Sequence, residues 1–213
     1  SRRSPPPMLN PWNRFIYRAW APVYDAATEY LFTPPRRRAL DLLALKPGER
    51  VLIPGVGTGA DLPYLPSGIH ALGVDLSPAM LARARAKLPL PGRDIELVEG
   101  DAENLPGVAP SSFDAAVLHL ILAVVPDGAA CLRATMRALV PGGRAVVFDK
   151  FVPDGQEVGP ARRALNTVTS TFGTDVTRRF GDLARGSGCR VVHDEPALFG
   201  GVFRILVLRK DTE

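Results

Sequence analysis

Short apolar runs alternate with helix-like segments over most of the chain, starting at about Glu49. The runs are too short for helices and are apolar almost throughout, which is typical of parallel strands buried on both faces. The predicted strands are Val51 to Ile53, Ile69 to Val74, Ile95 to Val98, Phe113 to Leu118 and Arg144 to Phe148. The predicted helices are Ala60 to Tyr64, Ala79 to Leu88, with Ser77-Pro78 as its N-cap, and Gly128 to Leu139 before a Pro141-Gly142-Gly143 turn. This alternation predicts an α/β fold, with a mostly parallel sheet covered by helices on both faces.

The last part of the chain breaks the alternation. A helical region from about Gln156 to Ala184 leads to a strand at Arg190 to His193, and the short loop Pro196 to Gly201 separates that strand from Phe203 to Leu208. A loop of this length cannot make a parallel crossover, so we expect the last strand to run antiparallel to its neighbour.

The first 45 residues are expected to lie outside the sheet. Residues 1–7 are basic and proline-rich and are predicted to be a disordered arm. Met8 to Phe32 holds both tryptophans and three of the four tyrosines, and such an aromatic strip can pack on its own domain, cap a pocket or lie on a membrane surface. Pro34-Pro35 is expected to end this region before a helix at Arg36 to Leu45. We therefore predict a single domain over residues 8–213, made of a helical cap (8–45) and a core (49–213).

Composition narrows the functional classes. The 213 residues are 46% hydrophobic, and the excess of 26 basic over 22 acidic residues is too mild to indicate a nucleic-acid partner. Cys131 and Cys189 have no metal-ligand spacing, so we expect no metal site and reduced thiols, as in a cytoplasmic protein. The longest apolar run, Ala115 to Val125, is far too short to span a bilayer, and no secretory signal is evident. Peripheral contact with the inner membrane face through residues 8–32 is the alternative.

A glycine-rich bend follows the first predicted strand. Gly55, Gly57 and Gly59 alternate there, and a helix-like segment comes next, as in a strand–turn–helix cofactor site. Without Cβ atoms the backbone can turn tightly and approach a ligand, while the first N–H groups of the next helix point at it. The spacing with Ala60 also fits a dinucleotide fingerprint, so a nicotinamide-dependent oxidoreductase is an alternative, although no second nucleotide-binding half follows the fifth strand.

Five segments, in order, resemble the class I S-adenosylmethionine-dependent methyltransferases. They are Val51 to Ala60, Gly73 to Leu81, Gly100 to Pro106, Phe113-Asp114 and Leu139 to Gly143. The resemblance implies a Rossmann-like seven-stranded sheet in the order 3-2-1-4-5-7-6 with the last strand antiparallel, in agreement with the loop-length argument. Within the family the chain looks most like the ubiquinone and phospholipid N-methyltransferase-like group, through Trp20 to Asp25 and Leu198 to Phe203.

The same resemblance implies S-adenosylmethionine as the cofactor and S-adenosylhomocysteine as the product. Asp75 ends the second strand and can accept hydrogen bonds from both ribose hydroxyls. In the family pattern Asp101 lies near the adenine amino group, Ala102 donates its N–H, and Leu76 or Met80 packs against the ring. Both carboxylates could instead cap helices. The cofactor-binding residues that the resemblance implies are Pro54, Gly55, Val56, Gly57, Gly59, Asp61, Asp75, Leu76, Met80, Asp101, Ala102, Glu103 and His119.

One position departs from the family pattern. Ile53 stands where relatives usually carry an acidic residue that helps hold the methionine end of the cofactor. Asp61 and His119 are the candidate replacements. If Asp61 serves the cofactor, Asp61→Ala weakens cofactor binding; if it caps the short helix, only stability falls. The missing acid also leaves open a non-catalytic, cofactor-binding member of the family.

Methyl transfer requires mainly that the nucleophile be held in line with the methyl carbon and that water be excluded. A base is needed only for an acceptor that arrives protonated, and His119, after the fourth strand, is the best candidate; a buried structural histidine is the alternative. Tyr24 resembles an aromatic residue that closes over the cofactor in relatives, although it could simply pack there. Tyr17, Tyr24, Lys150 and His193 are weaker candidates for the catalytic role. The predicted reaction moves a methyl group to an N, O or S atom of a small apolar or amphipathic acceptor, such as a lipid amine, a quinone-type phenol or a natural product.

Overall fold

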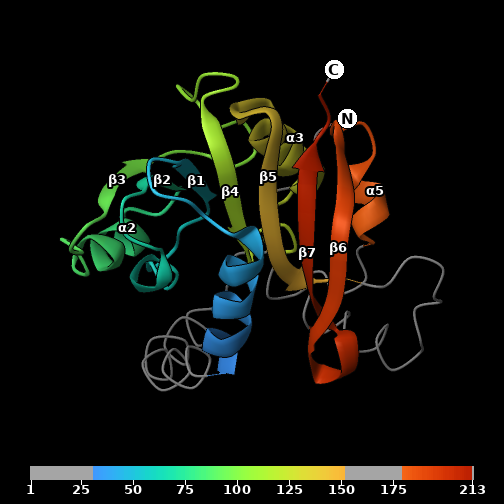
Figure 1. Cartoon of the computed structure of the whole chain (residues 1–213), viewed down its shortest axis with the longest axis horizontal. Helices are drawn as coiled ribbons and strands as arrows, with labels where there is room; N and C mark the ends of the chain where they lie inside the picture. Colours follow the sequence, from blue (N-terminus) through green and yellow to red (C-terminus); the bar gives the residue numbers. More distant parts are fainter. Residues whose placement is uncertain (1–30, 152–178, 213) are drawn as a thin grey trace, which may run out of the picture. The chain divides into compact units, whose positions relative to one another are not determined.

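The computed structural model describes residues 31–151 and 179–212. Seven strands form one sheet in the order β3-β2-β1-β4-β5-β7-β6 (Figure 1). The strands are β1 (Arg50–Pro54), β2 (His70–Asp75), β3 (Asp94–Glu99), β4 (Phe113–His119), β5 (Leu139–Lys150), β6 (Cys189–Leu198) and β7 (Phe203–Lys210). The predicted strand order is confirmed.

Strand directions also follow the prediction. β1 pairs in parallel with β2 and β4, β2 pairs in parallel with β3, and β4 pairs in parallel with β5. β7 runs antiparallel to both β5 and β6, and only residues 199–202, which include the short 3-10 helix η3 (Phe199–Gly201), lie between β6 and β7. The carboxyl ends of β1 to β5 therefore share one edge of the sheet with the β6–β7 turn.

The described helices begin where the sequence supplies caps. α2 (Pro78–Arg85) begins after Ser77, whose hydroxyl accepts the N–H of Met80, and α3 (Gly128–Ala138) begins after Asp127, whose carboxylate accepts the N–H of Ala130 at 2.8 Å. The others are α5 (Phe180–Ala184), the 3-10 helix η1 (Leu62–Tyr64) and helical residues 31–43. The predicted helix at Ala60 to Tyr64 is therefore shorter and of the 3-10 type. Residues 156–178 of the predicted final helical region lie outside the described residues.

Two elements begin well before their predicted first residues. β5 already begins at Leu139, because the expected turn at 141–143 is absorbed as an irregularity in the pairing with β4, where Gly142 takes a φ of +74°. Pro34-Pro35 does not precede a separate helix, since residues 31–43 are helical. A proline costs a helix its own N–H bond and crowds the preceding turn, but burial of Ala39 and Leu43 stabilises this segment through packing.

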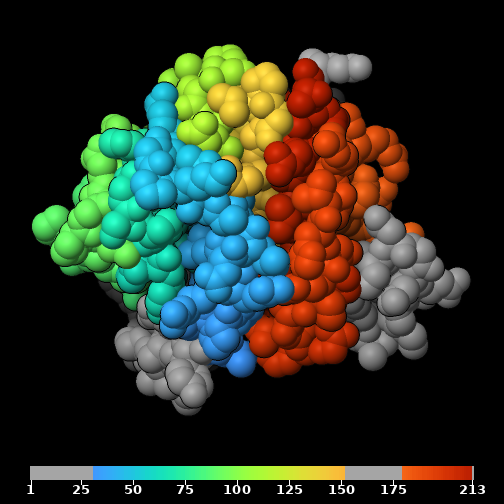
Figure 2. Space-filling view, viewed as in Figure 1, coloured from blue at the N-terminus to red at the C-terminus, as the bar shows by residue number. Residues whose placement is uncertain are grey.

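The sheet is covered differently on its two faces. On one face, Leu118 of β4 and Val147 of β5 pack in a core with Leu132 and Met136 of α3. On the other, Arg144 of β5 donates from Nε to the carbonyl oxygen of Leu43 at 2.6 Å and from Nη2 to that of Ala44 at 2.8 Å. These bonds satisfy carbonyls at the helix end, and Figure 2 shows residues 35–43 lying over this face.

Contacts within the chain separate Ser1–Pro34 from Pro35–Glu213, and the whole sheet belongs to the second unit. The predicted cap over residues 8–45 stays a prediction, because residues 8–30 lie outside the described part. None of the described helices is long and apolar enough to cross a membrane.

Candidate functional site

The glycine bend lies at the carboxyl end of β1, in the middle of the sheet. Gly55, Gly57 and Gly59 all have positive φ angles, of +66°, +55° and +70°. Residues with a Cβ rarely adopt this region, so the alternation of glycines is what allows the chain to reverse here between β1 and η1.

The three glycines have different surroundings. A Cβ at Gly55 would meet Cγ1 of Ile121 at 2.7 Å, and a Cβ at Gly59 would meet Cδ1 of Leu62 at 2.8 Å. A Cβ at Gly57 would meet nothing closer than the carbonyl oxygen of Gly55, at 3.9 Å. Gly55 and Gly59 therefore allow close packing within the protein, whereas Gly57 borders open space.

Several backbone N–H groups of the bend already bond inside the protein. Val56 donates to the Val74 carbonyl at 3.0 Å, Gly57 to the Asp75 carboxylate at 2.8 Å, and Gly59 to the Val56 carbonyl at 3.0 Å. The N–H groups of Thr58 and Ala60 have no acceptor among the residues that the structure describes. These two N–H groups are therefore available to a ligand.

Asp75 joins the bend to the start of α2. Its Oδ2 accepts the N–H of Gly57 at 2.8 Å and its Oδ1 accepts the N–H of Ser77 at 2.9 Å. Ser77, and not Asp75, caps α2, so the capping alternative for Asp75 is wrong. Each carboxylate oxygen keeps a further lone pair that can accept a hydroxyl from a ligand.

Apolar side chains beside Asp75 are exposed. Leu76 is 69% exposed and Met80 is 38% exposed, although large apolar side chains are usually buried. Nearby, Asp101 accepts the N–H of Glu103 at 2.9 Å in a local turn, and Ala102 is buried. Oε1 of Glu103 already has a hydrogen-bond partner, because it accepts the N–H of Asp127 at 2.8 Å. This part of the edge offers apolar surface next to carboxylates and suits a flat, partly polar ring.

A buried charged group lies between the bend and the end of β4. Asp61 is 4% exposed, and its Oδ1 lies 2.8 Å from Nδ1 of His119 while its Oδ2 accepts from Nη1 of Arg36 at 2.6 Å. Burial opposes ionisation of Asp61, but contacts with His119 and Arg36 hold its pKa well below the usual range. The carboxylate is therefore charged, and because a carboxylate only accepts, Nδ1 of His119 is its donor.

The other ring nitrogen of His119 is the exception in this network. Nε2 is buried and has no hydrogen-bond partner among the described residues, and the side chain is 1% exposed. The ring stands edge-on to Phe148 of β5, with centroids 5.9 Å apart. When the imidazole is neutral with its proton on Nδ1, Nε2 carries a lone pair that can accept a proton. Buried polar atoms are normally paired, so this nitrogen indicates a site for a polar ligand atom.

The structure also places the remaining predicted residues. Ile53 and Val56 are buried, and Val56 packs against Gly73, where a Cβ would meet its Cγ2 at 3.0 Å. Asp61 makes no side-chain capping bond to η1, so that alternative is wrong. Pro54 is buried at the end of β1. Tyr24 and Tyr17 lie outside the described residues.

Arg36 was not identified as a candidate residue from the sequence. It belongs to the run Arg36-Arg37-Arg38, whose members have separate partners: Arg36 binds Asp61, Arg37 lies 5.6 Å from the ring centroid of Tyr64, and Arg38 binds Glu195 of β6. Nothing in the local sequence distinguishes the first arginine, because its partner is 25 residues away and comes close only when the chain folds.

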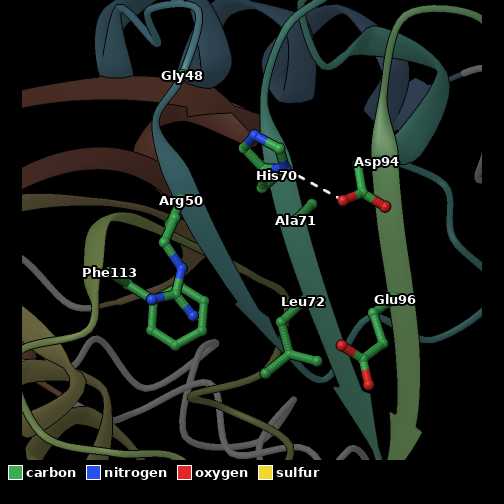
Figure 3. Close-up of a pocket in the computed structure, with 8 residues that line it drawn as sticks. All are labelled: Gly48, Arg50, His70, Ala71, Leu72, Asp94, Glu96 and Phe113. Carbon is green, nitrogen blue, oxygen red and sulfur yellow. Dashed lines mark hydrogen bonds and ion pairs between the residues drawn. The ribbon is translucent and has the colours of Figure 1, made fainter.

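A separate cavity opens at the opposite, amino-terminal edge of the sheet (Figure 3). It has a volume of about 530 Å³ and is lined by side chains that include Arg50, His70, Asp94, Glu96 and Phe113. Nδ1 of His70 lies 3.1 Å from Asp94, and Arg50 lies over the ring of Phe113. This cavity contains none of the predicted site residues.

The cysteines have no catalytic environment. Cys131 is buried in α3, where burial raises the pKa of its thiol to about 12, and burial also raises the pKa of the Cys189 thiol. A raised thiol pKa means little thiolate and low reactivity. No group of three or more metal-ligating side chains was found within residues 31–151 and 179–212.

Comparisons with known proteins agree on one family. The family profile described as "Methyltransferase domain" matches residues 52–147. A phosphatidylethanolamine N-methyltransferase of Cereibacter sphaeroides is 31% identical over 192 residues, which cover 89% of this chain and 93% of that protein. A demethylmenaquinone methyltransferase of Beutenbergia cavernae is 38% identical over 119 residues, 55% of this chain and 48% of that protein, so the match spans about half of that relative. The crystal structure of an S-adenosylmethionine-dependent methyltransferase from Mesorhizobium loti superposes with a TM-score of 0.60 at 26% identity, over 81% of this chain and 96% of that one.

Proposed function

Since the chain belongs to the class I S-adenosylmethionine-dependent methyltransferases, we propose that it methylates a small amphipathic acceptor. The nucleophilic atom of this acceptor binds next to Nε2 of His119. The cofactor is S-adenosylmethionine, and the relatives give no support to the nicotinamide alternative. The finer parts of the proposal are the acceptor and the role of each residue.

The residues at the carboxyl edge fit this cofactor. Exposed Leu76 and Met80 supply apolar surface for an adenine ring, and Asp75 keeps lone pairs for ribose hydroxyls. Gly57 borders open space, and the N–H groups of Thr58 and Ala60 can donate to a carboxylate of the ligand. Asp101 and Ala102 lie at the end of β3, where the adenine amino edge is expected. Bound S-adenosylmethionine supplies a methyl group activated by a sulfonium.

The buried Nε2 of His119 is the observation that carries the proposed role in catalysis. Arg36 keeps Asp61 ionised, Asp61 holds Nδ1–H of His119, and the lone pair of Nε2 is left facing away from this pair. A nitrogen fixed in this way can take a proton from an ammonium or hydroxyl of the acceptor, or orient it by a hydrogen bond. Because Nε2 is buried, an acceptor atom bound beside it would be shielded from solvent.

The relatives suggest two acceptor classes. The phosphatidylethanolamine N-methyltransferase, which matches along most of its length, is named for a lipid amine, and the demethylmenaquinone methyltransferase is named for a quinone. Both acceptors combine a polar head with a long apolar part. We therefore extend the proposal to a lipid-like acceptor, with the lipid amine favoured because that relative is covered almost completely.

An equilibrium and a turnover experiment test this proposal together. Calorimetry should show binding of S-adenosylhomocysteine, and thermal shifts should respond to it and not to NADH, because a ligand of the native state raises its stability. Radiolabelled S-adenosylmethionine should then transfer label to phosphatidylethanolamine in detergent micelles or to a demethylated quinol. Binding without transfer to any acceptor of a broad panel would indicate a non-catalytic member of the family.

A further inference from the structure

Lys150 ends β5 on the same face of the sheet as His119. Phe148 is the register partner of His119, and Lys150 lies two residues further along β5, so the three side chains point to one side. Phe203 of β7 is the register partner of Lys150 and lies on this side too. The lysine therefore stands beside the catalytic candidate at the carboxyl edge of the sheet.

The ammonium of Lys150 is unusually placed for a lysine. It is more than half buried, and burial lowers its pKa. Nζ lies 5.6 Å from the ring centroid of Phe203 and forms no ion pair with any residue of the described ranges. Lysines are seldom buried without a counter-ion, so the position favours binding of an anion.

Nearby carboxylates are already paired. Asp149 adjoins Lys150 in sequence, but it points to the opposite face, and its oxygens accept the N–H groups of Ala123 at 3.0 Å and Lys150 at 2.8 Å. Asp61 binds Arg36 and His119, and Glu195 binds Arg38 through both oxygens, at 2.9 and 3.1 Å. None of the three forms an ion pair with the ammonium of Lys150, although the nearby charge of Asp149 partly offsets the effect of burial on the pKa of Lys150.

Aromatic rings lead from His119 past Lys150 to the surface. The ring centroids of Phe148 and Phe203 are 5.7 Å apart, and those of Phe203 and Phe199 are 5.8 Å apart. Phe199, in the β6–β7 turn, is 60% exposed. An exposed aromatic residue next to a desolvated cation suits a ligand with an anionic group and an apolar part.

From this arrangement we propose that Lys150 binds a phosphate group of the methyl acceptor, while Phe203 and Phe199 contact its apolar part. A lysine ammonium is a compact donor that binds phosphate oxygens as a point charge. This inference rests on the proposed function, since it assigns the site to the acceptor. It selects a phosphate-bearing acceptor, such as a phospholipid amine, over an uncharged quinol.

Binding of a simple probe tests the subsite without turnover. Decyl phosphate, below its micelle concentration, should bind the wild-type protein saturated with S-adenosylhomocysteine, and Lys150→Met should weaken this binding about 10- to 100-fold, the usual loss of one charge-assisted hydrogen bond. Lys150→Arg should retain most of the affinity because it keeps the charge. Lys46→Met, which removes the same charge from an exposed residue before β1, is the control and should bind as the wild type does.

Further binding measurements identify which kind of molecule carries the phosphate. They also distinguish a failure of the Lys150 subsite from a failure of the proposed function. Inorganic phosphate binding as tightly as decyl phosphate would assign a small soluble acceptor, whereas binding of decyl phosphate alone assigns a lipid-like one; either result supports the subsite if it depends on Lys150. Equal binding by wild type and Lys150→Met, at unchanged melting temperature and cofactor affinity, overturns it. If decyl phosphate binds in a way that depends on Lys150 but the protein transfers no methyl group, the subsite is supported and only the proposed function is refuted.

Discussion

Oδ1 of Asp61 lies 2.8 Å from Nδ1 of His119, although 58 residues separate them in the chain. The contact joins the segment after the glycine bend to the last residue of β4, and Arg36 completes it from the other side of Asp61. With the carboxylate ionised, the imidazole is fixed in orientation and in tautomer, as in other sites where a carboxylate holds a functional histidine. The other ring nitrogen, Nε2, has no hydrogen-bond partner among the described residues.

His119→Asn should abolish most of the methyl transfer while keeping the fold. The amide nitrogen of asparagine can still donate to Asp61, but the variant has nothing in the place of Nε2. We expect kcat to fall about 100-fold or more, the usual loss when a positioned acid–base group is removed. Calorimetry should give an affinity for S-adenosylhomocysteine within about threefold of wild type, a change of less than about 0.7 kcal/mol. His70→Asn, at the opposite edge of the sheet, is the matched control. An unchanged kcat in His119→Asn would make this a structural histidine.

Asp61→Asn should be destabilising in a way that depends on pH. Removing one partner of a buried ion pair leaves Arg36 without its counter-ion, which costs about 3 kcal/mol of unfolding free energy. Because the pKa of Asp61 is lowered in the folded state, its stabilising effect is complete above the unfolded pKa of about 4 and is lost as the pH falls through the folded value.

Urea unfolding of both proteins from pH 3 to pH 8 measures this difference. The gap in unfolding free energy between wild type and Asp61→Asn should narrow as the pH falls below about 4. A gap that is equally wide at pH 3 would mean that the ionised carboxylate is not what stabilises the folded state. Asp114→Asn, at the amino-terminal end of β4, is a control that leaves Arg36 paired.

The strands and the direction of the last one were predictable from local signals in the sequence, whereas the strand order was implied by the family resemblance. Apolar runs such as Val51 to Ile53 specify buried strands, and the short loop after β6 fixes the direction of β7. The Asp61–Arg36 pair was not predictable, because it depends on how the helical residues 35–43 pack on the sheet. Likewise, the turn expected at 141–143 became part of β5, since pairing with β4 outweighed the preference of proline and glycine for turns.

Gly55→Ala should mainly reduce stability, whereas Gly57→Ala should mainly weaken ligand binding. Both positions have positive φ, so each variant carries about 1 kcal/mol of backbone strain. At Gly55 the new methyl group also collides with Ile121, so we expect a clear loss of stability that Ile121→Ala partly reverses. At Gly57 no protein atom is in the way, so the fold should survive while affinity for S-adenosylhomocysteine falls about tenfold.

Thermal melts with and without S-adenosylhomocysteine separate the two effects. Gly55→Ala should lower the melting temperature in both conditions, and the double variant with Ile121→Ala should recover part of the loss. Without ligand, Gly57→Ala should melt about 2–4 °C below wild type, a smaller loss than that of Gly55→Ala, and it should gain less from the ligand. If Gly57→Ala binds the ligand as tightly as wild type, the bend does not approach the cofactor.

Arg144→Met should reduce stability without affecting the site. Its guanidinium binds both carboxylate oxygens of Glu49, at 2.9 and 2.7 Å, and the carbonyl oxygens of Leu43 and Ala44. Removing it leaves several partly buried acceptors unpaired and should lower the free energy of unfolding by about 2 kcal/mol. The hydrogen bond from Arg144 is the main cause that lowers the pKa of Glu49. The contribution of the pair is therefore present above the unfolded pKa of about 4.3 and is lost as the pH falls through the lower folded value.

Arg144→Lys distinguishes the bidentate geometry from the charge. Lysine keeps the positive charge but cannot bind both oxygens of Glu49 and the helix carbonyls together, so it should recover less than half of the lost unfolding free energy. Urea unfolding at pH 7 and at pH 3.5 should show a smaller difference between wild type and Arg144→Met at the lower pH. Affinity for S-adenosylhomocysteine should be the same in all three proteins, because Arg144 lies at the amino-terminal side of β5 and the glycine bend lies at the opposite edge. A loss of cofactor affinity in Arg144→Met would mean that the packing of residues 35–43 on the sheet, and with it the position of Arg36, depends on this end of the helix.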